Sequence, residues 1–429
     1  MKSKRIFKFL SFFAATLFVI AAVTYFYSTQ TAQHLIVAAL IVMAIAFQGH
    51  KNLKGFTYSV FIIVGICLGM FFPHSFTEWG DFKLDRLIVP FVQVTMLGMG
   101  AQMSFDDFKG VIKMPKGVVT GVICQFTVMP LVAFILSRVF NFPPEIAAGV
   151  VLIGVVPSAM ASNVMSFLAK ANLALAVTIG ATATLLAPFI TPMLMRWLGG
   201  QYIEVNVISM MLDITNMIIV PIIAGFIFNL YYRENSLRSK QAQMSVFALI
   251  IIVVNLILHF STHANISVTL IQVAKSFLFF YFLPFIVALI LKNSKRITYP
   301  MISSALGFVA MLGIVINTTI VTAAGRDSLM QVGILLILSC LIHNVVGYTV
   351  GYSAAKLMKL PVKDRRTIAF EVGMQNGGVA TGLALEMGKI ATVGLASAIF
   401  GPLQNLTGSA LVQIFKRQPI NTVTTSTQD

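Results

Sequence analysis

A carboxylate and two amides lie inside a stretch that is otherwise apolar enough for a lipid bilayer. The stretch is AFEVGMQNGGVATGLALEMG, residues 369–388, and its polar groups are Glu371, Gln375 and Asn376, followed by a glycine pair. Insertion scales put an ionised acid at the membrane centre at about 2.5–3.5 kcal/mol, so a residue kept there is a functional candidate. Carboxylate and amide oxygens are also the ligands that hard cations prefer.

Two further apolar segments carry polar side chains of the same kind. Gln125 lies in GVICQFTVMP, and Ser162 and Asn163 lie in VVPSAMASNVMSFLAK, shortly after Pro157. A single amide at this depth is typical of a hydrogen bond between helices, worth on the order of 1 kcal/mol. Together with Glu371, these groups offer many oxygen ligands and one formal charge. That set favours a monovalent or small divalent cation, bound partly by main-chain carbonyls.

His343 in LSCLIHNVVGY allows two interpretations. It can be a proton relay, or a neutral histidine packed in a helix bundle, and we favour the second. An intramembrane enzyme that uses Glu371 with His343 is a separate hypothesis, which requires both side chains to reach a shared water. The motifs GxxxxGK, HExxH and GxSxG do not occur, so neither an ATPase nor a metallohydrolase is supported.

The composition of the chain indicates a membrane protein. Of its 429 residues, 58% are hydrophobic and 10% are charged, whereas a soluble domain has about a quarter charged residues. Long apolar runs with short polar connections predict an all-α polytopic membrane protein, because helices satisfy their own backbone groups in lipid. The net charge of +16 fits basic cytoplasmic loops, so nucleic acid is not an expected partner.

Hydropathy predicts fourteen membrane segments: 6–27, 31–48, 56–73, 87–103, 117–136, 147–168, 172–195, 205–230, 244–260, 268–291, 299–324, 330–355, 367–385 and 390–415. The first is interpreted as a retained span and not a signal peptide, because it is long and no A-x-A-like site follows. If every segment crosses, 23 of the 30 basic residues lie on the side of the N-terminus and 6 on the other, with Lys275 inside a segment. This asymmetry predicts an integral protein of a plasma (inner) membrane with both termini cytoplasmic.

Two of these segments are expected to be interrupted helices. Segment 147–168 contains Pro157, and segment 367–385 contains three glycines around its two amides. Paired interrupted helices in corresponding positions of two halves indicate the midplane site of a transporter. Counting from segment 56–73, the first is fourth in a group of five. The second is fourth in its own group if the two segments between 244 and 291 are an inserted pair.

Several motifs resemble the bile acid:sodium symporter (BASS) family. They are ASNVMSFLAKANLALAV, TLLAPFITPML, DRRTIAFEVGMQNGGVATGLAL, LIHNVVGYTVGY and LQNLTG, and the likeness covers residues 56–416 apart from about 235–295. The resemblance implies two inverted five-helix repeats, divided into a core domain and a panel domain. It also implies that segments 147–168 and 367–385 are two discontinuous helices that cross in the core.

On this pattern the chain is expected to have five parts. They are an N-terminal extra helix pair (1–55), the first repeat with the start of the second (56–230), an inserted helix pair (231–298), the rest of the second repeat (299–416) and a cytoplasmic tail (417–429).

The resemblance further implies two sodium sites and a substrate site near the crossing point. The first sodium site takes the side chains of Gln125, Glu371 and Gln375 with the main chain of Val372 and Met374, and the second takes Ser162, Asn163 and Glu371. The substrate site takes Asn376 and Asn405, with Met160 and Gln404 at positions where relatives often carry a hydroxyl or a histidine.

Some positions depart from the family pattern. Ala176 and Gly180 stand where two hydroxyl residues usually complete the second sodium site, and Thr184 lies one turn further on. Ser158, Ala159 and Met160 stand where the family often has Gly-Gly-Thr, and the methionine removes a hydroxyl contact and narrows the cavity. The first sodium site is therefore expected to be intact and the second incomplete, and pantoate-like acids and 2-oxo acids stand beside bile acids as substrates.

The sequence as a whole predicts a secondary active transporter. It would import a small organic anion with sodium as the co-transported ion, by alternating access in the lipid bilayer. A proton-coupled or facilitative organic-anion transporter of the same fold is the alternative, motivated by Ala176 and Gly180.

Overall fold

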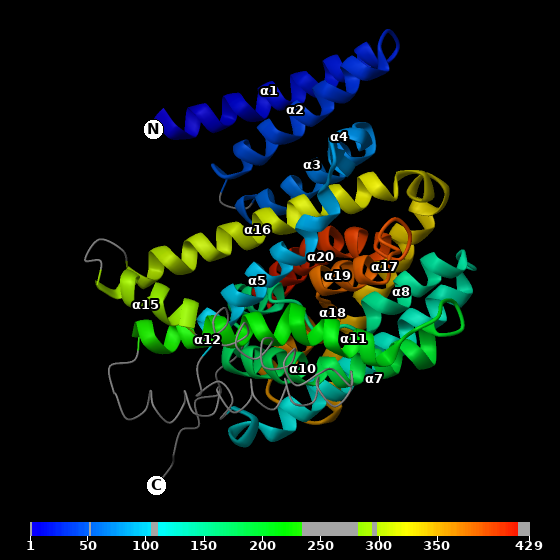
Figure 1. The fold of residues 1–429 in the computed structure, drawn as a ribbon. Coiled ribbons are helices and arrows are strands. Elements are labelled where there is room, and N and C mark those ends of the chain that lie inside the picture. Colours follow the sequence, from blue (N-terminus) through cyan, green and yellow to red (C-terminus); the bar gives the residue numbers. More distant parts are fainter. Residues whose placement is uncertain (1, 51–52, 104–109, 234–281, 294–297, 419–429) are drawn as a thin grey trace. The chain divides into compact units, whose positions relative to one another are not determined.

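The computed structural model describes residues 2–50, 53–103, 110–233, 282–293 and 298–418, which form helices and one short β-hairpin (Figure 1). The chain divides into two compact units. The first is Met1–Ile88 with Phe108–Met211 and Ile314–Asp429, and the second is Val89–Asp107 with Leu212–Gly313. The predicted segment 244–260 and most of segment 268–291 lie outside the described residues.

The first unit contains an N-terminal helix pair, the hairpin, and most of the helices with polar residues at membrane depth. Its elements are α1 (Lys2–Tyr25), α2 (Thr29–Phe47), η1 (Lys54–Phe56), α3 (Thr57–Phe71), α4 (Pro73–Thr77), β1 (Glu78–Trp79), β2 (Phe82–Lys83), η2 (Leu84–Leu87), α7 (Pro115–Val139), α8 (Pro144–Val155), α9 (Ala161–Leu168), α10 (Leu173–Leu194), η3 (Met195–Gly199), α17 (Arg326–Leu357), α18 (Val362–Gly373), α19 (Gly377–Glu386) and α20 (Leu395–Arg417).

The second unit contains the π-helical turn η4 (Thr215–Ile219), α12 (Val220–Arg233) and α15 (Leu283–Asn293). Most of α5 (Ile88–Gln102) and α16 (Tyr299–Ala324) belongs to it as well, while α11 (Val207–Ile214) runs across the division between the units. Within this unit, the Asn229 side chain on α12 donates to the carbonyl of Met103, just after α5, at 2.7 Å.

Local sequence explains several helix ends. The helices α7 and α8 begin at Pro115 and Pro144, where the missing N–H has no intrahelical partner to lose. The Asn172 side chain caps α10 by accepting from the N–H of Leu175 at 3.2 Å. After α19, Gly388 adopts a φ of +66°, the left-handed conformation that commonly ends a helix.

The helices have the length and composition of membrane spans. Among the described residues, eight are long and apolar enough to cross a bilayer, and Thr57–Phe71 and Pro144–Val155 are apolar but shorter. A helix needs about 20 residues to cross the hydrocarbon core. The short α8 is followed by a break and then by α9, so the predicted segment 147–168 consists of two helices. The prediction of an all-α polytopic membrane protein is confirmed.

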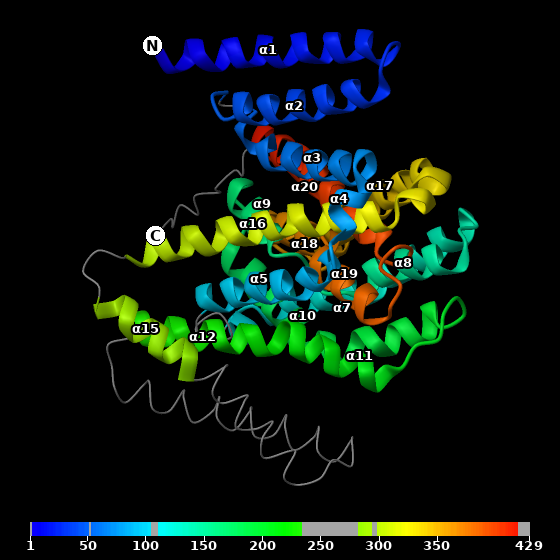
Figure 2. The same ribbon diagram turned by 45° about the horizontal axis from the view of Figure 1, so that its top comes forward.

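The N-terminal helix pair lies next to α3. The helices α1 and α2 run antiparallel and side by side (Figures 1 and 2). One side of α2 packs against α3 through a buried cluster of small and branched side chains: Val37, Leu40, Ala44, Val60 and Val64. The pair is therefore attached to the first unit through α2, whereas α1 exposes many large apolar side chains, as a helix facing lipid would.

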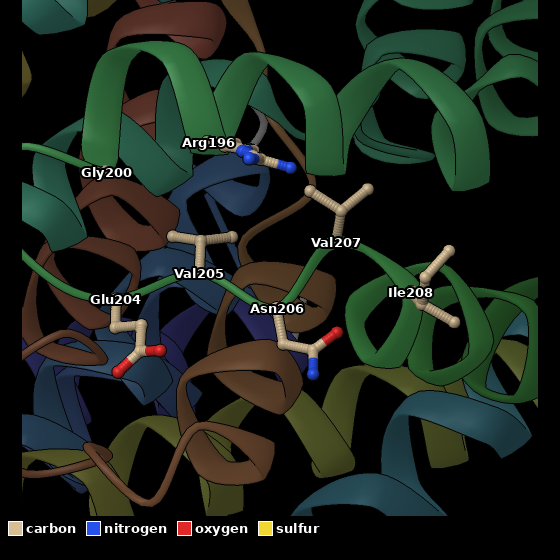
Figure 3. Close-up of a pocket in the computed structure, with 7 residues that line it drawn as sticks. All are labelled: Arg196, Gly200, Glu204, Val205, Asn206, Val207 and Ile208. Atoms are coloured by element: carbon tan, nitrogen blue, oxygen red, sulfur yellow. The ribbon is translucent and has the colours of Figure 1, made fainter.

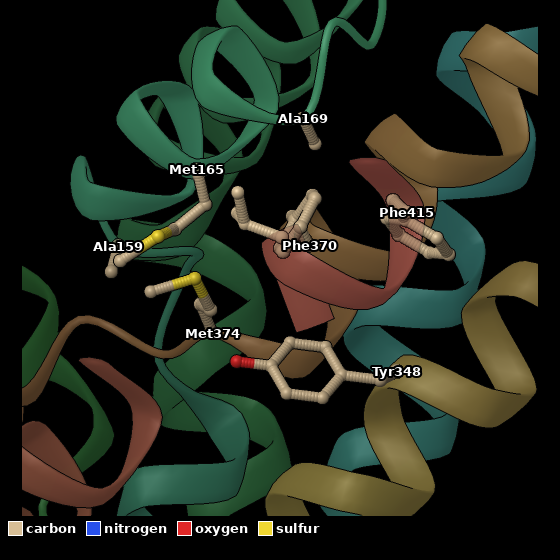
Figure 4. Close-up of a cluster of buried hydrophobic side chains, with 8 residues drawn as sticks. Ala159, Met165, Ala169, Tyr348, Phe370, Met374 and Phe415 are labelled. Carbon is tan, nitrogen blue, oxygen red and sulfur yellow. The ribbon is translucent and has the colours of Figure 1, made fainter. Parts of the chain in front are cut away.

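A second buried cluster joins α9, α17, α18 and α20 (Figure 4). Phe370 on α18 lies at its centre and is fully buried. Tyr348 and Phe415 contact it edge to face, with ring centroids at 6.0 Å and 5.7 Å, an arrangement that aromatic pairs prefer. Because Glu371 follows Phe370 in the chain, this packing fixes the rotation of the last turn of α18.

The start of α8 is tied to the segment between α19 and α20. Lys389 forms an ion pair with Glu145, and the hydroxyl of Thr392 donates to the other carboxylate oxygen at 2.6 Å. The hydrogen bond from Lys389, then that from Thr392, lowers the pKa of Glu145 below its ordinary value of 4.5. The two interrupted helices are thereby connected at one end.

We expect Glu145→Gln to lower the free energy of unfolding by about 0.5 kcal/mol at neutral pH, since the ion pair is partly exposed. A lowered pKa means that the contribution is present above the ordinary value and lost as the pH falls through the folded-state pKa. Chemical denaturation in detergent at neutral and acidic pH measures both effects. The exchange Glu145→Lys with Lys389→Glu restores the ion pair but not the hydrogen bond from Thr392, so it should recover only part of the loss. Equal stability of the single variant and the parent would contradict the role.

Candidate functional site

Two helix breaks meet inside the first unit. The helix α8 ends at Val155 and α9 begins at Ala161, while α18 ends at Gly373 and α19 begins at Gly377. The two breaks pair as a short antiparallel bridge between Ser158 and Gln375. α18 packs against α9, and α19 packs against α8, as can be followed in Figure 2.

The paired breaks satisfy each other's backbone. The N–H of Ala159 donates to the carbonyl of Met374 at 3.0 Å, and the N–H of Asn376 donates to the carbonyl of Pro157 at 2.9 Å. Pro157 has no N–H, so the break avoids one donor that would otherwise need a partner. Irregular backbone is tolerated at membrane depth where it is buried in protein, and these hydrogen bonds meet that condition.

Glu371 lies on the last turn of α18 and is 1% exposed. Its Oε2 accepts from the Ser158 hydroxyl at 2.7 Å, and its Oε1 accepts from the Ser162 hydroxyl at 2.5 Å. In the described part of the chain, no Lys, Arg or His forms an ion pair with this carboxylate. A buried carboxylate held by two neutral hydroxyls favours the uptake of a cation or a proton, because an uncompensated charge is costly there.

Two amide side chains, Gln125 and Gln375, lie at the paired breaks. The Gln125 Nε2 donates to Gln375 Oε1 at 2.7 Å and to the Val156 carbonyl at 2.9 Å. The Gln375 Nε2 donates to the carbonyl of Val372 at 2.9 Å. Both glutamines are at most 1% exposed. The structure therefore brings together Gln125, Gln375 and Val372, although Gln125 and Gln375 are separated by 250 residues in the chain.

Asn163 lies beside Ser162 on the first turn of α9. Its Oδ1 is buried and has no hydrogen-bond partner, which is unusual because most buried polar atoms are paired. The Ser162 hydroxyl has a second acceptor within reach, the Ala159 carbonyl at 2.7 Å. A free amide oxygen and a hydroxyl next to a carboxylate are chemically suited to an oxygen-liganded cation.

Gln404 on α20 clamps the second break. Its Oε1 accepts from the N–H of Gln375 at 2.7 Å, and its Nε2 donates to the Gln375 carbonyl at 3.0 Å. Asn376 caps α19 by accepting from the N–H of Val379 at 3.2 Å. Asn405 donates to Gly401 in its own helix at 2.9 Å. Gln404 and Asn376 thus both hold the backbone of the second break, whereas the hydrogen bond of Asn405 stays within α20.

Met160 occupies the last position of the first break, immediately before α9. It is partly exposed, and its carbonyl accepts from the N–H of Asn163 at 3.2 Å. All eleven residues predicted for the two sodium sites and the substrate site therefore lie on α7, α9, α18, α20 or the two breaks.

Two residues at the site were not singled out as ligands from the sequence. Ser158 was noted as a departure, yet its hydroxyl contacts Glu371. Asn344 on α17 donates to the Gly373 carbonyl at 2.7 Å and accepts from Thr407, so it holds the end of α18. The motif LIHNVVGY contained Asn344, but nothing in its spacing indicated that partner.

His343 has different neighbours from Glu371. Its Nε2 lies 3.0 Å from the Met129 carbonyl, and its ring contacts Phe400 edge to face. The partners of Glu371 are Ser158 and Ser162. The geometry favours the packed histidine and gives no support to joint chemistry with the carboxylate.

A surface pocket of about 510 Å³ lies between η3 and α11 (Figure 3). It is lined by Arg196, Gly200, Glu204, Val205, Asn206, Val207 and Ile208. None of the residues predicted for the site lines this pocket. Among the described residues, no group of three or more His, Cys, Asp or Glu side chains could hold a metal ion, so the oxygen-rich set around Glu371 is of a different kind from a transition-metal site.

Comparison with known proteins gives the class. A family model described as the Sodium Bile acid symporter family matches residues 89–266. YocS of Bacillus subtilis (strain 168), named an uncharacterized sodium-dependent transporter, is 33% identical over 369 residues, which are 86% of this chain and 93% of the relative. The probable chloroplastic sodium/metabolite cotransporter BASS1 of Arabidopsis thaliana is 26% identical over 363 residues, 84% of this chain and 73% of the relative.

These matches define the class as sodium-dependent membrane transporters. The chain belongs to the sodium bile acid symporter family. The names of the family and of both relatives are those of transporters.

We expect Gln404→Ala to lower the free energy of unfolding by about 2 kcal/mol, because it leaves a buried N–H and a buried carbonyl of Gln375 unpaired. Gln413→Ala is the matched control, since Gln413 lies on the same helix and is exposed. Denaturant unfolding in detergent measures both. Equal stabilities of the two variants would contradict the clamp.

Proposed function

We propose that the protein is a secondary active transporter that imports a small organic anion together with sodium, by alternating access. The observation that carries this proposal is the buried Glu371 carboxylate, which two neutral hydroxyls hold and which has no cationic side-chain partner among the described residues. A bound cation would supply the missing charge. The empty carboxylate is costly in lipid, so the loaded form is favoured before the site moves across the membrane.

Sodium is the substrate for which we propose two groups of ligands. The first group is the side chains of Gln125, Glu371 and Gln375 with the main chain of Val372 and Met374. The second is Ser162, Asn163 and Glu371. The unpaired Oδ1 of Asn163 supports oxygen ligation. The Oε1 atoms of Gln125 and Gln375 each accept one hydrogen bond from the other glutamine and keep a second lone pair for a cation. The shared carboxylate would couple occupancy of the two groups.

The organic anion would bind beside the paired breaks, at Asn376, Asn405, Gln404 and Met160. The helices α9 and α19 both begin at the breaks. The N-terminal end of a helix carries a partial positive charge, and interrupted helices of transporters direct such ends toward anionic groups. Bile acids, pantoate-like acids and 2-oxo acids share the carboxylate or sulfonate that this arrangement would receive.

The architecture that we propose is a pair of inverted five-helix repeats, with a core domain that carries two crossing interrupted helices and a panel domain. The pairing of Ser158 with Gln375 and the packing of α18 on α9 and of α19 on α8 support it. The excess of Lys and Arg in alternate loops supports cytoplasmic termini in a plasma membrane.

We expect sodium to raise the melting temperature of the purified protein when potassium keeps the ionic strength constant. Binding to the folded state alone contributes about 2.7 kcal/mol at a hundredfold excess over Kd. Glu371→Gln should abolish this response. Glu386→Gln is the matched control, because Glu386 is exposed on α19 and should respond to sodium as the parent does. A parent without any sodium response would overturn sodium coupling.

We expect an inward sodium gradient to drive uptake into proteoliposomes of one of three radiolabelled probes: taurocholate, pantoate or pyruvate. Uptake should persist at alkaline pH and should be lost in Glu371→Gln. Uptake that follows an imposed proton gradient without sodium would favour proton coupling. Uptake that needs neither gradient would favour a facilitative transporter.

A further inference from the structure

The two carboxylate oxygens of Glu371 accept hydrogen bonds from two serines, one in the first break and one on the helix that follows it. Ser162 holds Oε1 from the first turn of α9, and Ser158 holds Oε2 from the break itself. The backbone of Ser158 is fixed, because it pairs with Gln375 and its neighbour Ala159 donates to Met374 at 3.0 Å. The position of its Cβ is therefore fixed beside the carboxylate, and the hydroxyl donates to Oε2 at 2.7 Å.

The helix α10 also approaches the Oε2 atom of Glu371, but it does so at Gly180, which has no side chain. A Cβ built on Gly180 would lie 3.5 Å from Glu371 Oε2 and 3.7 Å from the Ser158 Oγ, both ordinary contact distances. One turn away, Ala176 has only a methyl group, and the Thr184 hydroxyl donates to the Gly180 carbonyl at 2.7 Å. Among these three residues of α10, none directs a hydroxyl toward the carboxylate.

We propose that Ser158 is a sodium ligand, and that it supplies from the break the hydroxyl that Gly180 does not supply from α10. A hydroxyl has one proton and two lone pairs. The Ser158 Oγ can therefore donate to Glu371 Oε2, as observed, and offer a lone pair to a cation at the same time. A Cβ at position 180 would lie 3.7 Å from the Ser158 Oγ, so Gly180 leaves that side of the hydroxyl without a side chain.

This assignment has a consequence for coupling. Ser158 pairs with Gln375 through the main chain, and Gln375 is clamped by Gln404. A cation bound to the Ser158 hydroxyl would stabilise the junction, to which Asn376 belongs through its N–H on the Pro157 carbonyl. Ser158 thus joins the carboxylate to the paired breaks through its own main chain, whereas Ser162 on α9 reaches the first break only through the Ala159 carbonyl.

The inference rests on the proposed sodium coupling, and the experiment separates the two. The sodium concentration that gives half of the maximal thermal stabilisation is measured in the purified protein, with potassium as the balancing ion. In Ser158→Ala this sodium concentration should rise about tenfold, because the variant lacks a hydroxyl that would bind the cation and that donates to the charged carboxylate. Ser166→Ala is the matched control, since Ser166 is fully buried on α9 and its hydroxyl has no partner.

A second pair of variants tests where the hydroxyl comes from. Ser158→Ala combined with Gly180→Ser returns a hydroxyl to the same oxygen from α10, so it should recover most of the sodium response. Ser158→Ala combined with Gly180→Ala adds the same Cβ without the hydroxyl, and should not. Recovery in the serine double variant also shows that the effect is not a failure to fold.

The outcomes are distinct. A tenfold rise in Ser158→Ala that only the Gly180→Ser combination reverses supports the assignment. A sodium response in Ser158→Ala equal to that of the parent overturns the role of Ser158 and leaves sodium coupling intact. A parent protein without a sodium response overturns both.

Discussion

The constraint on which this structure depends is the need to satisfy backbone hydrogen bonds where two helices stop inside the protein. A buried N–H or carbonyl that finds no hydrogen-bond partner is expensive. The protein solves this by pairing one break with the other, through Ser158 with Gln375, Ala159 with Met374, and Asn376 with Pro157. Backbone groups of each break therefore find their partners in the other break.

The pairing also determines where the charged group lies. Because Ser158 is opposite Gln375, the last turn of α18 lies against the first turn of α9, and Glu371 meets Ser162. The aromatic packing around Phe370 fixes the rotation of α18. The carboxylate is thus held by elements from both breaks, and a ligand bound to it contacts both interrupted helices at once. In the transporter that we propose, this contact would let cation binding move the paired helices as one body.

Much of the site could be predicted because its residues are costly to keep in apolar sequence. Glu371, Gln375, Gln125 and Asn163 stand out as polar groups in membrane segments, and all four lie at or beside the paired breaks. Gln404 was predicted as a substrate residue, and the structure adds that it clamps the Gln375 backbone. The second role was invisible in the sequence, because an amide on a helix does not indicate which distant main chain it reaches.

The sequence by itself determined that the chain lies in a membrane and that helices break near Pro157 and near Gly377. It also determined that one carboxylate, that of Glu371, is retained shortly before the second break. These follow from local properties: apolar composition, a missing N–H and weak helix propensity. Only the tertiary structure decided that the Ser158 hydroxyl contacts Glu371 and that α10 has a glycine, Gly180, beside the same carboxylate oxygen. Ser158 and Glu371 are 213 residues apart, and their contact depends on the register in which two distant helix breaks pair.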